Sequence, residues 1–211
     1  APESFLGAFC LLLGLSYLLY EIPFAIDAGQ LASPMTFTGR LLYDVSVVVV
    51  ALFNRRFFRG VGSAPLVGAT ILLVVTGLAL SVLRGDWDGY APLRNTGFWL
   101  EWSGQIVPLM WLGVESGVQW TRAKRRVSLG LAEPMAAHRF LLWSSFAWLN
   151  MCANFALVPM YVEFEVVYRF SSALDLLIGA LEIAAVATLG LAFFPPAGYV
   201  QWLARGARRA A

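Results

Sequence analysis

The chain has 211 residues, of which 59% are hydrophobic and 13% are charged. Soluble globular domains carry about 25% charged residues, so this composition argues against an ordinary soluble domain and indicates a helical protein that crosses a membrane several times. The 15 basic and 13 acidic residues give a formal net charge of +2. That excess is too small to indicate binding to nucleic acid.

Six apolar segments approach the length of about 20 residues that a helix needs to cross the hydrocarbon core of a membrane. The first segment has neither the basic start nor the small-residue cleavage pattern of a signal peptide, so we interpret it as a span. The predicted spans are residues 3–20, 39–56, 66–83, 98–120, 140–161 and 171–194. We therefore expect a single all-α membrane domain over residues 1–211, built as a bundle of six transmembrane helices.

Proline and glycine mark the ends and contacts of these segments. Residues 21–37 contain two prolines and are predicted to form a loop. In the third span, Gly68 and Gly77 would let another helix approach closely. A Pro-Pro pair after the sixth span ends that helix, because proline lacks the backbone donor and clashes with the preceding turn. The tail, residues 197–211, combines aromatic residues with a basic end and is predicted to form a short interfacial helix.

Basic residues are concentrated in every second connection, after spans 2, 4 and 6. The opposite connections, 21–37, 84–97 and 162–170, hold few of them. Cytoplasmic loops are rich in Lys and Arg, so this asymmetry predicts that both termini are cytoplasmic. Anionic lipid head groups are the expected partners of the basic residues beside spans 2 and 4. These residues are Arg55, Arg56, Arg122, Lys124, Arg125 and Arg126.

Several polar side chains lie inside the predicted spans, where their cost makes them informative about function. At a rise of 1.5 Å per helical residue, five of them share a layer roughly 5–10 Å below the predicted outer surface. Asn150 and Glu182 lie deeper, near the middle of the membrane. The whole set, which forms the predicted ligand-binding site, is Arg40, Asp44, Gln105, Asn150, Asn154, Asp175 and Glu182.

The spacing of these residues indicates which of them face one another. Arg40 and Asp44 are four residues apart, so they lie on one helix face and can form an ion pair. Asp175 and Glu182 are seven residues apart and also share a face. We expect Glu182 to be neutral, hydrogen-bonded to a group such as Asn150, or facing water.

Two interpretations of the polar layer stay open. In the first, the layer is an outward-facing cleft in which Arg40 holds an anionic group and the other side chains supply hydrogen bonds. In the second, the polar groups bind one another and fix the helix bundle, each interhelical hydrogen bond contributing about 0.6 kcal/mol.

The sixth span also carries small residues on one side, which would admit another helix backbone closely. This small-residue face would pack within the bundle or against a partner subunit. Its members are Gly179, Ala180, Ala184 and Ala187.

The sequence contains no recognisable catalytic motif, phosphate-binding loop or cofactor motif, and its one histidine and two separated cysteines predict no metal site. The favoured function is a non-catalytic integral membrane subunit that acts through lateral contacts with other membrane subunits or with copies of itself. One alternative is a sensory or solute-binding domain that uses the polar cleft. Another is a small transporter that uses intramembrane carboxylates. The Ala-, Gly-, Leu- and Arg-rich composition fits a bacterial inner membrane.

Overall fold

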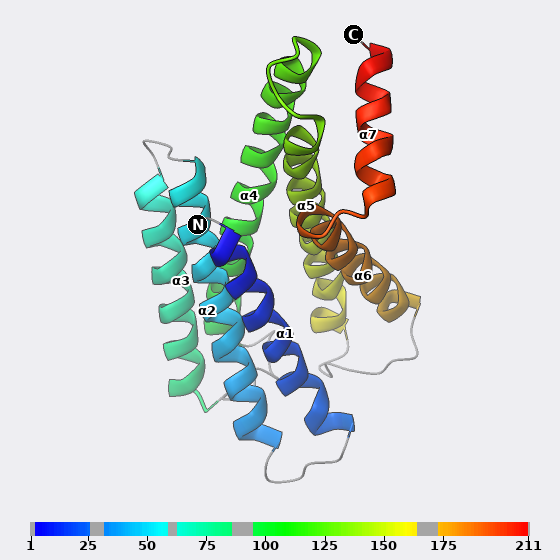
Figure 1. Ribbon diagram of the computed structural model, residues 1–211. Coiled ribbons are helices and arrows are strands. Elements are labelled where there is room, and N and C mark those ends of the chain that lie inside the picture. Colours follow the sequence, from blue (N-terminus) through cyan, green and yellow to red (C-terminus); the bar gives the residue numbers. More distant parts are fainter. Residues whose placement is uncertain (1–2, 26–31, 59–62, 86–94, 164–172, 211) are drawn as a thin grey trace. The chain divides into compact units, whose positions relative to one another are not determined.

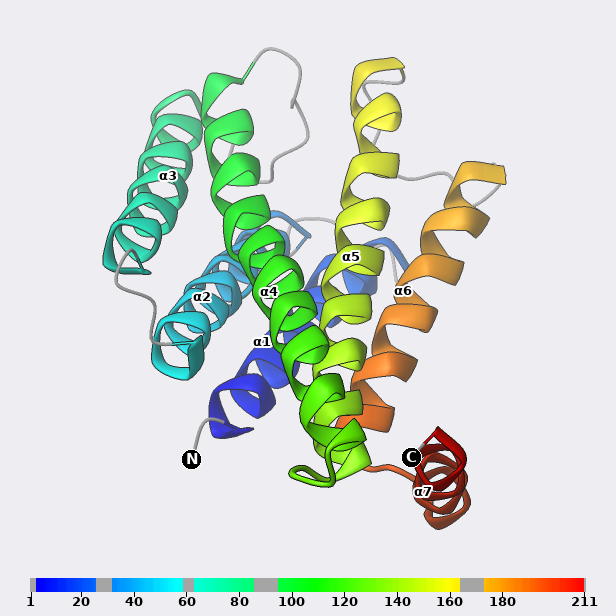
Figure 2. The same ribbon diagram turned by 90° about the horizontal axis from the view of Figure 1, so that it is seen from above.

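A computed structural model of the chain describes residues 3–25, 32–58, 63–85, 95–163 and 173–210. These residues form seven helices and no strand (Figures 1 and 2). The helices are α1 (Glu3–Ala25), α2 (Ala32–Phe58), α3 (Ser63–Leu83), α4 (Thr96–Ser128), α5 (Pro134–Glu163), α6 (Ala173–Phe193) and α7 (Ala197–Ala210). The all-α class predicted from the sequence is therefore confirmed for the described residues.

The chain divides into two compact units, which we describe separately. The first unit comprises Ala1–Pro108 with Pro159–Tyr168, and the second comprises Leu109–Val158 with Arg169–Ala211. The boundary falls inside α4, at the proline in that helix. In the first unit α1 packs along α2, and α2 contacts α3. The single domain expected from the sequence stays a prediction.

Four of the helices are long and apolar enough to cross a membrane. The qualifying stretches are Pro34–Phe58, Ser63–Leu83, Pro134–Val158 and Leu176–Phe193. They correspond to predicted spans 2, 3, 5 and 6. The chain is therefore consistent with a helical membrane protein.

Predicted spans 1 and 4 are helical but do not meet the same criterion. Among the residues of α1 whose side chains the structure describes, the apolar stretch is Ser4–Leu19. The α4 helix has 33 residues but carries Glu101, Gln105 and Glu115 within the predicted span, and these residues lower its hydropathy. The number of spans and the cytoplasmic position of both termini stay predictions.

The predicted loop over residues 21–37 is wrong at both of its ends. The α1 helix continues to Ala25, and α2 already begins at Ala32. Pro34 is compatible with this start because the first turn of a helix has no intrahelical partner for its N–H groups, so proline costs little there. The remainder of the predicted loop, residues 26–31, lies outside the described residues.

The basic segment after predicted span 4 belongs to the helix itself. The α4 helix continues to Ser128, so Arg125 and Arg126 lie in its last turn. It ends in a Schellman motif, in which the N–H of Leu131 donates to Arg126 O (2.8 Å) and the N–H of Gly130 donates to Val127 O (3.0 Å). Gly130 has a φ of 70°, which glycine adopts without steric cost. Pro134 then opens α5, so the turn between the two helices is short.

The predicted C-terminal helix is present as α7. Its Tyr199 ring lies edge-on to His138 near the start of α5, with 5.6 Å between the ring centroids. Tyr199 also stacks with Trp202 at a centroid distance of 6.0 Å, and Trp202 is 63% exposed. The contact between Tyr199 and His138 holds the first turn of α7 beside α5. The location of α7 at a membrane surface stays a prediction.

Candidate functional site

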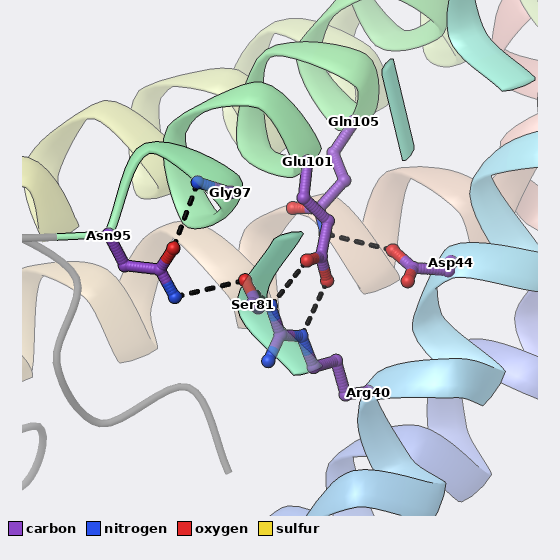
Figure 3. A network of polar contacts seen from close by, with 7 residues as sticks. All are labelled: Arg40, Asp44, Ser81, Asn95, Gly97, Glu101 and Gln105. Carbon is purple, nitrogen blue, oxygen red and sulfur yellow. Dashed lines mark hydrogen bonds and ion pairs between the residues drawn. The ribbon is translucent and has the colours of Figure 1, made fainter. Parts of the chain in front are cut away.

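The centre of the candidate site is a buried ion pair between α2 and α4. Arg40 Nε donates to Glu101 Oε1 at 2.7 Å, and Arg40 Nη2 pairs with Glu101 Oε2 (Figure 3). Both side chains are almost fully buried, with relative exposures of 5% and 4%. A two-point pairing of guanidinium with carboxylate is the strongest ordinary form of this interaction and fixes the relative rotation of the two helices.

Ser81 of α3 joins the same network. Its hydroxyl oxygen accepts one hydrogen bond from Arg40 Nη2 (2.9 Å) and another from Asn95 Nδ2 (3.0 Å). Asn95 in turn is the N-cap of α4, because its Oδ1 accepts from the N–H of Gly97 at 2.9 Å. The network therefore connects three helices and fixes the point at which α4 begins.

Close contact between the backbones of α3 and α4 makes this arrangement possible. A Cβ atom built at Gly77 would lie 2.6 Å from the carbonyl oxygen of Gly97, and one built at Gly104 would lie 2.8 Å from Val74 Cγ2. Glycine is the residue that allows such an approach. The sequence-based expectation for Gly77 is thus confirmed. At Gly68 no described atom lies within 4 Å of an added Cβ, so the parallel expectation stays a prediction.

A second contact between α2 and α4 lies one helical turn from the ion pair. Gln105 Nε2 donates to Asp44 Oδ1 at 3.2 Å, and Asp44 is 4% exposed. The other carboxylate oxygen, Oδ2, is buried and has no hydrogen-bond partner among the described residues. Arg40 and Asp44 are four residues apart, as are Glu101 and Gln105. The Arg40–Glu101 and Asp44–Gln105 contacts therefore join the same faces of α2 and α4, one helical turn apart.

Two of the predicted site residues in the second unit, Asn150 and Asn154, contact each other. Asn154 Nδ2 donates to the backbone oxygen of Asn150 (2.9 Å) and to its side-chain oxygen (3.0 Å), and both residues are buried. Glu182 is half-buried on α6. Asp175 also belongs to α6, but its side chain lies outside the described part of the structure. Of the seven predicted residues, the structure brings Arg40, Asp44 and Gln105 together around Glu101.

The small-residue face of α6 is open within its own unit. A Cβ built at Gly179 has no atom within 4 Å, and Ala180 and Ala187 are exposed. Ala184 is half-exposed. The role of the small-residue face in packing or in binding a partner stays a prediction.

Sequence reasoning missed three members of the network, Ser81, Asn95 and Glu101. Glu101 lies between two tryptophans, Trp99 and Trp102, which indicated a membrane interface rather than a site. The signal that would have found it is its spacing of four residues from Gln105, which matches the spacing of Arg40 and Asp44. The side chains of Ser81 and Asn95 are ordinary polar groups at helix ends, and no sequence pattern distinguishes them.

Another buried polar group braces α4 at its proline. Asn54 Nδ2 on α2 donates to the backbone oxygen of Pro108 at 2.8 Å, and Asn54 is fully buried. The contact therefore joins α2 to α4 beside the proline.

The chemistry available to the site follows from these contacts. The guanidinium of Arg40 already binds Glu101 and Ser81 in a buried setting, so an anionic ligand would have to displace Glu101. The fold and the site thus define an all-helical protein with apolar helices long enough to cross a membrane and a charged network between them. Comparison with known proteins found no matching family model, no similar curated protein and no similar solved structure.

Proposed function

We propose that this chain is a non-catalytic integral membrane protein with six spans and cytoplasmic termini, which acts through lateral contacts with other membrane proteins. A bacterial inner membrane is its proposed location. The observation that carries the proposal is that Arg40, the residue predicted to hold an anionic group, is used within the protein to join α2, α3 and α4. The charged residues of the first unit therefore support structure more directly than they support recognition of a solute.

The small-residue face of α6 supports the lateral-contact proposal. In its own unit this face has open space at Gly179 and exposed alanines at positions 180 and 187. In a membrane, where lipid tails are as apolar as side chains, close backbone approach is a main source of helix association. The small-residue face is the surface that we propose for a partner subunit or a second copy.

Site-specific photo-crosslinking in the native membrane tests this proposal. A photoreactive residue is placed at Ala187, on the small-residue face, and in a matched variant at Val114 of α4. Both positions are exposed and belong to the same unit, but Val114 lies on a different helix. We expect a discrete protein adduct from position 187 and only lipid adducts from position 114. Lipid adducts alone at both positions would contradict a lateral partner on this face.

A small ion-coupled transporter is the second candidate function. The specific observation that favours it is the buried Oδ2 atom of Asp44, for which no hydrogen-bond partner is found among the described residues. A sensory or solute-binding role remains an alternative that requires a ligand able to compete with Glu101 for Arg40. Thermal stabilisation of the purified protein by a panel of small carboxylates, lost in Arg40→Lys, would favour this alternative.

A further inference from the structure

The polar network between α2 and α4 contains an imbalance of charge. It holds one guanidinium, Arg40, and two carboxyl groups, Glu101 and Asp44, all within a few per cent of full burial. If all three were ionised, the cluster would carry one excess negative charge. An uncompensated charge in a buried apolar setting is strongly unfavourable, so the cluster needs one further positive charge.

No basic side chain in the described part of this unit is placed to supply that charge. Arg40 is bound to Glu101 and Ser81, while Arg55, Arg56 and Arg84 are exposed. The α3 helix has no ionisable residue. The α1 helix has no basic residue, and its Tyr17 ring meets the Tyr43 ring of α2 edge-on, with 6.5 Å between the ring centroids.

The two oxygens of Asp44 have different environments. Oδ1 accepts a hydrogen bond from Gln105 Nε2, which leaves Oδ2 buried without a donor. Glu101 lies beside Asp44, since Glu101 and Gln105 on one face of α4 contact Arg40 and Asp44 on one face of α2. Two ionised carboxylates repel each other, but a carboxylic acid donates a hydrogen bond to a carboxylate. A proton on Oδ2 would therefore satisfy the unpaired atom and neutralise the cluster at the same time.

We propose that Asp44 and Glu101 together form a binding site for one proton, carried on Asp44 Oδ2 and donated as a hydrogen bond to the Glu101 carboxylate. Gln105 orients the acid by binding Oδ1, and Arg40 holds Glu101 in place by pairing with it. The site takes up or releases a single proton between α2 and α4. Release restores the excess negative charge, so it weakens the contact between these helices. This proton site is independent of the lateral partner proposed above.

Infrared spectroscopy of the full chain in lipid nanodiscs tests the proposal directly. A buried carboxylic acid gives a carbonyl band that is separate from carboxylate bands and that shifts in heavy water. We expect such a band near neutral pH in the wild type and its loss in Asp44→Asn. We also expect its loss in Glu101→Gln, because removing one negative charge lets Asp44 ionise beside Arg40. The matched control, Glu115→Gln on the same helix, should keep the band.

A second measurement does not depend on assigning the band. If folding takes up a proton, the unfolding equilibrium constant rises with pH, by up to tenfold per pH unit. We expect this slope in the wild type from about pH 4, where an unfolded aspartate loses its proton, up to the pH at which the folded site releases its proton. We expect a flatter curve in Asp44→Asn, whose amide can donate to Glu101 as the acid does. Absence of the infrared band in the wild type would overturn the proposal. Equal pH slopes of unfolding in the wild type and in Asp44→Asn would overturn it as well. Stabilisation by sodium or potassium that disappears in Asp44→Asn would also overturn it, in favour of a metal cation as the occupant.

Discussion

Gly77 of α3 and Gly97 of α4 meet backbone to backbone. A Cβ at Gly77 would lie 2.6 Å from the carbonyl oxygen of Gly97, and a Cβ at Gly97 would lie 2.7 Å from the hydroxyl oxygen of Ser81. This contact places Ser81 next to the first turn of α4, where Asn95 and Glu101 are found. The polar network thus depends on two residues that contribute no side chain to it.

The first prediction concerns this helix crossing. Gly77→Ala should destabilise the protein by about 1–3 kcal/mol, because the methyl group would press on backbone atoms that cannot rotate away. Unfolding in a detergent titration measures the change. Gly68→Ala on the same helix is the control, since its Cβ meets no atom within 4 Å and should leave stability unchanged or slightly raised. Equal losses in the two variants would show that the crossing is not as close as described.

The second prediction concerns the ion pair. Arg40→Ala should cost about 3–5 kcal/mol, because it leaves the Glu101 carboxylate buried without its partner. Replacing both residues by alanine should recover a large part of this loss. A double-mutant cycle of unfolding free energies measures the coupling, and exposed Arg55→Ala serves as the control for loss of a basic side chain on α2. If the Arg40/Asp44 double variant recovered more stability than the Arg40/Glu101 double variant, Asp44 would be the dominant partner of Arg40.

The third prediction separates two roles of Asn95. Asn95→Ala loses both the N-cap of α4 and the hydrogen bond to Ser81, for an expected cost of about 2 kcal/mol. Asn95→Ser keeps an N-capping oxygen but is too short to replace the amide donor, so it should lose about half as much. Thermal unfolding in the same detergent provides the comparison. A serine variant as unstable as the alanine variant would assign the whole effect to the contact with Ser81.

The fourth prediction tests the orientation in the membrane. In a background with Cys10 and Cys152 replaced by serine, a cysteine at Arg84 should react with a membrane-impermeant maleimide added to intact cells. A cysteine at Leu129 should react only after the membrane is opened. Both positions are exposed ends of helices. The reverse pattern of labelling would invert the topology predicted from the basic residues.

The elements that sequence reasoning placed well are those defined by local signals. The predicted span 66–83 matches the end of α3, where the chain turns at Gly85 with a φ of 78°. The predicted span 171–194 matches α6 because two prolines follow it. The start of α2 was misplaced because Pro34 indicates a loop in most contexts, whereas in the first turn of a helix it is well tolerated.

The candidate site was only partly predictable because it depends on which helices meet. The spacing of Arg40 and Asp44 correctly placed them on one face of α2, but the hydrogen-bond partner of each lies 61 positions further along the chain. A sequence shows that a buried arginine needs an acceptor, and it does not show which carboxylate provides it. The close approach of α3 to α4 at Gly77 decides that question, and it is a property of the packed structure.

The separation of Arg40 and Glu101 along the chain has a consequence for biosynthesis. The two partners are 61 residues apart. At about 5–20 residues per second, a ribosome needs roughly 3–12 seconds to make the intervening chain. During that interval Asp44, four residues away on α2, is the carboxylate nearest to Arg40 in the sequence. If the chain enters the membrane as it is made, Arg40 pairs first with Asp44 and exchanges this partner for Glu101 when α4 arrives.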